Sequence, residues 1–184
     1  DRILQRHREG SRSISFVGGS PDVQPLFVLK TLRGLPENLP VVWNSNLWIT
    51  PDTLEILDGI VDIFLSDLKY GPGDCDRKLS SANHTFETLI MLMGLIQQKG
   101  IKLMLRHLLL PGHGQCCTLP ILDELSKNFP GIYLNLMTGY RPFQMRKAKG
   151  PLNARLSKTE ESEILSAARQ FGSSLQLMRD GNPL

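Results

Sequence analysis

The chain is poor in cysteine and carries little excess charge. Its 184 residues contain three cysteines, Cys75, Cys116 and Cys117. That number is odd, and the adjacent pair could close only a strained bridge, so we expect no disulfide framework. The 21 basic and 18 acidic residues leave a formal charge of +3, which is too small to attract a nucleic acid by bulk charge. We therefore expect a reducing, cytoplasmic setting and no nucleic-acid partner.

Long apolar runs are lacking as well. No stretch approaches the roughly 20 apolar residues of a membrane span, and the first residues, DRILQRHREG, are charged and unlike a signal peptide. We expect no membrane partner. The chain also starts without methionine, inside a segment typical of the end of a helix, and we expect a fragment of a longer protein.

What the sequence does contain is an alternation of short apolar runs and amphipathic segments. Runs rich in β-branched or aromatic residues predict strands at residues 13–17, 39–43, 61–70, 101–110 and 132–138. Apolar residues at helical spacing, with N-cap and stop signals, predict helices over residues 50–59, 86–96, 118–125 and 157–171.

This order of strand and helix predicts an α/β fold with a parallel sheet and right-handed crossovers, either doubly wound or curled toward a barrel. The length predicts a single domain over residues 1–184. In both architectures ligands bind beyond the carboxyl ends of the strands, so the residues that end each run are the candidates for a site.

The first two strand ends offer bare backbone and amide groups. Gly18 and Gly19 let the chain turn tightly and let a ligand approach its backbone, although such glycines are also common in purely structural turns. Asn44 and Ser45 end the next run, where they could bind a ligand or simply cap the turn.

The next two strand ends carry charge. Asp67 and Lys69 are two residues apart, so a strand points both to one face, where they bind either a ligand or each other. Arg106 lies in an apolar strand and needs a carboxylate, from the protein or from a substrate. His107 points to the opposite face, and we interpret it as a core histidine.

A third group of polar residues follows the fourth strand. His113, Cys116 and Cys117 superficially resemble a metal site. No fourth ligand stands at a standard spacing, so we expect no zinc site and no metal ligand in this chain.

Five segments together resemble a known family. They are FVGGSP, VVWNSN, DIFLSDLKYG, LRHLLLPGH and YLNLMTGYRP, spread over nearly the whole chain. Their order is similar to that in the radical S-adenosylmethionine (SAM) enzymes, particularly the pyruvate formate-lyase activating enzyme and its relatives. The resemblance implies a partial (β/α) barrel, of which this chain would lack the first strand and the loop that binds the cluster.

The resemblance also implies roles for the uncharged strand ends. Gly18 and Gly19 would present backbone to the methionyl amino group of SAM, and Asn44 and Ser45 match a polar segment that contacts the cofactor. The third residue of the glycine motif is commonly acidic in the family. Ser20 stands there in this chain, so one charge-assisted contact to the ammonium group would be weakened or supplied elsewhere.

For the charged strand ends, the resemblance implies that Asp67 and Lys69 reach the ribose and carboxylate of SAM and that Arg106 lies near the cofactor. The family holds a [4Fe-4S] cluster on a CxxxCxxC motif, which is absent from these 184 residues. The cluster ligands are therefore expected upstream of residue 1.

By resemblance, the complete protein would cleave SAM reductively at its cluster to give a 5′-deoxyadenosyl radical. Its partners would be SAM, a reductant such as flavodoxin or ferredoxin, and a glycyl radical protein. The sequence leaves two alternative functions open. One is a non-catalytic SAM-binding module without a cluster, and the other is an unrelated (β/α) enzyme acting on a phosphorylated metabolite.

Overall fold

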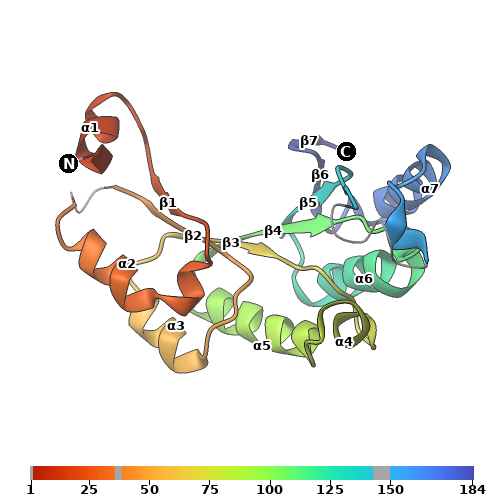
Figure 1. Ribbon diagram of the computed structural model, residues 1–184, viewed down its shortest axis with the longest axis horizontal. Helices are drawn as coiled ribbons and strands as arrows, with labels where there is room; N and C mark the ends of the chain where they lie inside the picture. Colours follow the sequence, from red (N-terminus) through yellow and green to blue (C-terminus); the bar gives the residue numbers. More distant parts are fainter. Residues whose placement is uncertain (1, 36–38, 143–149) are drawn as a thin grey trace. The chain divides into compact units, whose positions relative to one another are not determined.

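The computed structural model describes residues 2–35, 39–142 and 150–184. Strands and helices alternate along the chain from α1 to β7 (Figure 1). The strands are β1 (Ile14–Phe16), β2 (Val41–Ser45), β3 (Ile63–Asp67), β4 (Lys102–Leu108), β5 (Tyr133–Met137), β6 (Gln176–Arg179) and β7 (Asn182–Pro183). The α-helices are α1 (Arg2–Arg8), α2 (Pro25–Leu32), α3 (Pro51–Leu57), α4 (Cys75–Ser80), α5 (Thr85–Gln98), α6 (Leu119–Asn128) and α7 (Lys158–Ala168).

The strands belong to one sheet in the order β1-β2-β3-β4-β5-β6-β7. β1, β2 and β3 pair in parallel, as do β5 and β6, whereas β7 is antiparallel to β6. Consecutive strands that pair in parallel require crossover connections, and helices supply them. The predicted α/β fold with parallel strands is confirmed.

Among the described residues, no helix is long and apolar enough to cross a membrane.

Two compact units can be distinguished. Unit 1 comprises Asp1–Ser66 and Met91–Met104, and unit 2 comprises Asp67–Ile90 and Leu105–Leu184. The core of unit 1 is built on Trp43 and Phe64, which are fully buried on β2 and β3. The core of unit 2 includes Leu134 and Leu136 of β5 with Ile121 of α6, all fully buried.

Local capping signals explain two helix starts. Thr50 accepts a hydrogen bond from the backbone of Thr53 at 3.2 Å, with Pro51 as the first residue of α3. Ser157 accepts one from the backbone of Glu160 at 3.1 Å, at the start of α7. Each hydroxyl satisfies a backbone N–H that has no partner within its helix. The predicted starts of these helices are confirmed, whereas α3 ends at Leu57 and α7 at Ala168, before the predicted ends.

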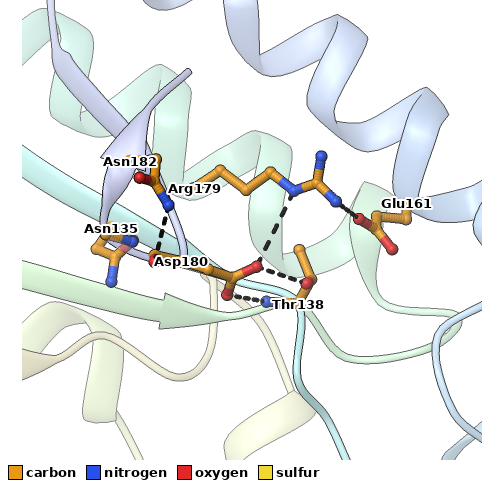
Figure 2. A network of polar contacts seen from close by, with 7 residues as sticks. Asn135, Thr138, Glu161, Arg179, Asp180 and Asn182 are labelled. Carbon is orange, nitrogen blue, oxygen red and sulfur yellow. Dashed lines mark hydrogen bonds and ion pairs between the residues drawn. The ribbon is translucent and has the colours of Figure 1, made fainter.

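A hairpin at the end of the chain supports the last parallel strand. Asp180, at φ 46°, forms the β6–β7 turn and accepts hydrogen bonds from both the backbone and the hydroxyl of Thr138, just after β5. Arg179 pairs with Glu161 of α7 (Figure 2), and the backbone of Gly181 donates to the side chain of Asn135. This network fixes the carboxyl end of β5 within unit 2.

Candidate functional site

The predicted glycine turn directly follows β1. Gly18, Gly19 and Ser20 have φ values of 87°, 63° and 54°, so three successive residues adopt a conformation that residues other than glycine rarely take. A Cβ atom at Gly18 or Gly19 would meet nothing within 4 Å. Backbone conformation, not packing, therefore accounts for the glycines.

Beside this turn lies a pocket of about 180 Å³, lined by Phe16, Val17, Gly18, Gly19, Ser20, Pro21, Gln24, Phe27 and Val28. The hydroxyl oxygen of Ser20 is buried and has no hydrogen-bond partner among the described residues. A buried polar atom without a partner is costly unless a ligand or water satisfies it. The turn thus combines accessible backbone with an unsatisfied hydroxyl.

Asp22 anchors the turn to the core of unit 1. One carboxylate oxygen accepts the indole N–H of Trp43 at 2.8 Å, and the other accepts the backbone N–H of Trp48 at 2.9 Å. Trp43 is fully buried, so its N–H needs this partner. No local pattern in the sequence marks Asp22, because its partners lie 21 and 26 residues away along the chain.

The second strand end forms a turn of its own. The hydroxyl of Ser45 accepts a hydrogen bond from the backbone of Leu47 at 2.9 Å, and Ser45 is buried. Leu47 has φ 53°, and this side-chain contact supports its left-handed backbone. The hydroxyl therefore serves as a turn cap, while SAM contacts by Asn44 and Ser45 stay predictions.

In unit 2 the structure brings Asp67 and Arg106 together. The Nε of Arg106 donates to Oδ1 of Asp67 at 2.6 Å, and both side chains are about a quarter exposed. Arg106 therefore pairs with a carboxylate of the protein itself, which was one of the two sources that the sequence left open. Lys69 lies just beyond β3 and is exposed. A role in SAM binding stays a prediction for Asp67, Lys69 and Arg106.

His107 is the core histidine that the sequence predicts. Its Nδ1 lies 2.6 Å from the carbonyl oxygen of Leu68 and its Nε2 lies 2.9 Å from the hydroxyl of Thr118. A carbonyl oxygen only accepts, so Nδ1 carries the proton and Nε2 accepts from Thr118. Burial lowers the pKa of His107 to about 4, and the ring is neutral at pH 7.

The structure overturns the expectation that His113, Cys116 and Cys117 lack a fourth ligand. Cys75, the first residue of α4, joins them, and the four ligand atoms lie within 4.8 Å of one another. The Sγ of Cys75 is 3.5 Å from both the Sγ of Cys116 and the Nδ1 of His113. Cys75 lies 38 residues before His113, so no local spacing could reveal it.

The backbone around these four residues, hereafter the Cys3His group, is unusual. Residues Gly114–Thr118 form a π-helical turn that runs into α6. A Cβ atom at Gly71 would lie 2.8 Å from the carbonyl oxygen of Cys116 and 2.8 Å from the Cα of Cys117. Glycine at this position therefore allows the segment after β3 to approach the two cysteines closely.

Burial dominates the ionisation of this group in the absence of a ligand. Burial raises the pKa of Cys117, against a hydrogen bond from the backbone of Gly71, and it also raises the pKa of Cys75. Burial lowers the pKa of His113, although the negative charge of Glu160 opposes this shift. Burial thus favours the neutral imidazole, which is the form that binds metals.

The predicted SAM-site residues fall into two sets. Gly18, Gly19 and Ser20 share one turn in unit 1, and Asp67 and Arg106 form one ion pair in unit 2.

No family model matches the chain, but a relative is found among curated proteins. The relative is an uncharacterized protein of Methanocaldococcus jannaschii, 36% identical over 170 residues, which cover 92% of this chain and 50% of the relative. The chain therefore spans about half the length of the curated relative that it matches.

Two solved structures share the fold. A domain of the pyruvate-formate lyase-activating enzyme from Bacteroides vulgatus matches with a TM-score of 0.67 and 14% identity, over 91% of this chain and 99% of that one. SuiB of Streptococcus suis, bound to S-adenosylmethionine, matches with a TM-score of 0.61 and 16% identity, over 98% of this chain and 40% of that one. The resemblance seen in the sequence is confirmed at the level of the fold.

Proposed function

We propose that this chain is the SAM-binding part of a radical SAM enzyme. The observation that carries the proposal is the turn at Gly18–Ser20, where left-handed backbone and an unsatisfied buried hydroxyl border a pocket. The fold shared with an activating-enzyme domain and with a SAM-bound protein supports the assignment.

The residues of this turn suit the amino-acid end of SAM. Backbone carbonyls at Gly18 and Gly19 can accept hydrogen bonds from an ammonium group, because both residues are exposed and glycine has no side chain of its own. The hydroxyl of Ser20 offers a neutral acceptor where the family commonly has an acid. We expect a weaker contact to the ammonium group from this hydroxyl than from a carboxylate.

The charged strand ends of unit 2 carry groups of the kind that bind a ribose or a carboxylate, as SAM has. Arg106 is held by Asp67 through Nε, which fixes the plane of its guanidinium group. A carboxylate of Asp67 can accept a hydrogen bond from a ribose hydroxyl, and Lys69 can pair with a carboxylate of the cofactor.

The ligands of the cluster that this chemistry requires are proposed to lie outside this chain. Its three cysteines lack the CxxxCxxC spacing, so the ligands of a [4Fe-4S] cluster would have to come from other residues of a longer protein. When bound, such a cluster supplies the one electron that breaks the bond between sulfur and C5′ of SAM, giving methionine and a 5′-deoxyadenosyl radical. A flavodoxin or ferredoxin would supply that electron, and a glycyl radical protein is the proposed substrate.

Substitution of Ser20 by alanine tests the SAM site. We expect SAM affinity to fall about 5- to 10-fold, as for the loss of one hydrogen bond, while the stability of the free protein is unchanged or raised because an unsatisfied buried hydroxyl is removed. Isothermal titration with SAM and urea denaturation measure the two effects.

The matched control is Ser126→Ala, which removes an exposed hydroxyl on α6 and should leave SAM affinity unchanged. Absence of SAM binding by the unmodified chain would contradict the proposal, as would equal affinities for the two serine variants.

The catalytic part of the proposal needs the longer protein, reconstituted anaerobically with iron and sulfide. Formation of 5′-deoxyadenosine on reduction in the presence of SAM would support it. A longer protein that binds SAM but shows neither a cluster absorption band nor 5′-deoxyadenosine would favour the alternative of a non-catalytic SAM-binding module without a cluster.

A further inference from the structure

We propose that the Cys3His group, Cys75, His113, Cys116 and Cys117, binds one zinc ion. All four ligand atoms already lie within 4.8 Å of one another, and they belong to a single compact unit. The site is independent of the SAM site proposed above and uses none of its residues.

Four of the six distances between the ligand atoms lie near the edges of a zinc coordination tetrahedron, and all six are within 4.8 Å. With Zn–S near 2.3 Å and Zn–N near 2.0 Å, a regular tetrahedron has edges of about 3.8 Å between sulfurs and about 3.5 Å between sulfur and nitrogen. The Sγ atoms of Cys116 and Cys117 are 3.9 Å apart, and those of Cys75 and Cys116 are 3.5 Å apart. The Nδ1 of His113 is 3.5 Å and 3.4 Å from the Sγ atoms of Cys75 and Cys116.

These distances also argue against an iron–sulfur cluster and against a disulfide at the same side chains. In a [4Fe–4S] cluster each thiolate binds a different iron, and in a [2Fe–2S] cluster the four ligands are divided between two irons, so in both the ligands are spread more widely than around a single ion. A disulfide brings two sulfurs to about 2.05 Å, whereas here all three cysteines are free. Three sulfurs and one nitrogen at tetrahedral spacing form the ligand set of a closed zinc site.

The chain builds the site from two segments. Cys75 follows the loop after β3, whereas Cys116 and Cys117 lie on the π-helical turn after β4 and His113 directly precedes that turn. His113 and Cys116 are three residues apart and therefore lie on one side of the turn. The wider π-helical turn lets the adjacent Cys116 and Cys117 reach the same point, and such turns are frequent at functional sites.

The surroundings suit thiolate ligands. The turn continues into α6, so its cysteines lie at the amino-terminal end of a helix, where negative charge is favoured. The backbone N–H of Gly71 lowers the pKa of Cys117 and the positive charge of Lys78 lowers that of Cys75, and both oppose the larger effect of burial, which raises the two pKa values. Three thiolates and a neutral imidazole around Zn²⁺ carry one net negative charge, which Lys78 partly offsets.

A zinc ion with four protein ligands has no open position, so the site is structural. It would fasten the segment after β3 to the turn after β4, the same two segments that His107 links through Leu68 and Thr118. Asp67 and Arg106 stand on these two strands, and zinc would thereby limit the movement of the ion pair they form.

Metal content is the first test. The chain, purified anaerobically with a reductant that does not bind metals, should contain about one zinc per molecule by mass spectrometry. Cobalt(II) added to the zinc-free chain should give the visible and near-ultraviolet bands of tetrahedral cobalt with thiolate ligands. Neither measurement involves SAM or a reduced cluster, so a failure here is distinct from a failure of the proposed function.

Substitution of the proposed ligands tests which residues bind zinc. Cys75→Ser should lower zinc affinity, measured by competition with a chromogenic chelator, on the order of 100-fold or more, because the site loses the ligand that joins its two segments. His113→Asn should act similarly, whereas the matched variant His7→Asn, on α1 of unit 1, should leave affinity unchanged.

A variant outside the ligand set adds a second check. Gly71→Ala should lower zinc affinity by roughly 10- to 100-fold, as is usual for groups that position a ligand, because its Cβ atom would clash with the backbone of Cys116 and Cys117. Gly94→Ala, whose Cβ atom meets nothing within 4 Å, is the control and should leave affinity unchanged.

Three outcomes would overturn the proposal. One is a chain that remains free of zinc and gives no tetrahedral cobalt spectrum. Another is a Cys75–Cys116 disulfide in the anaerobically purified protein. The third is an iron–sulfur absorption band, formed with iron and sulfide, that disappears in the Cys75→Ser variant.

Discussion

Substitution of His107 by alanine is expected to lower the free energy of unfolding by about 3–5 kcal/mol. His107 is 1% exposed, and its ring joins the carbonyl of Leu68 to the hydroxyl of Thr118. Alanine would remove both hydrogen bonds and leave a cavity between the two segments. Urea denaturation at pH 7 measures the change.

The control is His7→Ala on α1, a position without a buried hydrogen-bond network, where the change should stay within about 0.5 kcal/mol. A loss below about 1 kcal/mol for His107→Ala would show that the two segments do not depend on this ring.

The same residue gives the protein a pH-dependent stability. The pKa of His107 falls from 6.5 to about 4 on folding because of burial, so between these values the unfolded chain binds a proton that the native state does not. Stability is therefore fully present above pH 6.5 and is lost as the pH falls toward 4. Between pH 7 and pH 5 the loss from His107 should be about 2 kcal/mol.

His107→Gln isolates this contribution. Glutamine keeps one donor for Leu68 and one acceptor for Thr118 but does not ionise. The difference in unfolding free energy between the unmodified chain and this variant should therefore shrink or reverse as the pH falls from 7 to 5. A constant difference would contradict a depressed pKa at His107, and the contributions of other groups cancel in the comparison.

The second large effect is expected at Asp76. This carboxylate is 4% exposed and accepts hydrogen bonds from the backbone of Arg77 at 2.7 Å and from the backbone and hydroxyl of Thr85 at 2.9 and 3.0 Å. It thereby fastens the first residue of α5 to α4. Asp76→Ala would leave these donors unsatisfied, and we expect a loss of about 2–4 kcal/mol by urea denaturation.

Asp123→Ala is the matched control. Asp123 is an exposed carboxylate on α6 that pairs with Lys127, and such surface pairs contribute little. Equal effects of the two alanine substitutions would contradict a structural role for Asp76.

Much of the fold could be predicted from the sequence because its elements carry local signals. The apolar runs of β2 to β5 are long enough to predict strands, and Thr50 and Ser157 mark the starts of two helices. β6 and β7 were missed. β6 has four residues, of which one is buried, and the pairing that makes it a strand comes from β5, 43 residues earlier at Tyr133 and Gln176.

The candidate sites were predictable to different degrees. The turn at Gly18 and Gly19 is visible in the sequence, because its glycines are adjacent and directly follow a strand. Arg106 required a carboxylate, but only the folded chain shows that Asp67, 39 residues away, provides it. The Cys3His group needed the same long-range information, since Cys75 joins the other ligands only through the pairing of strands.

Gly19 and Gly71 are constrained in different ways, and the difference determines which other residues each position can accept. At Gly19 the space is open and the backbone is left-handed, so asparagine or aspartate, which tolerate this conformation, would be the least costly replacements whatever their size. At Gly71 the backbone of the neighbouring cysteines fills the space, and every replacement is excluded by its first carbon. Position 19 therefore admits a small set of alternative residues, whereas position 71 admits glycine alone for as long as the two segments stay in contact.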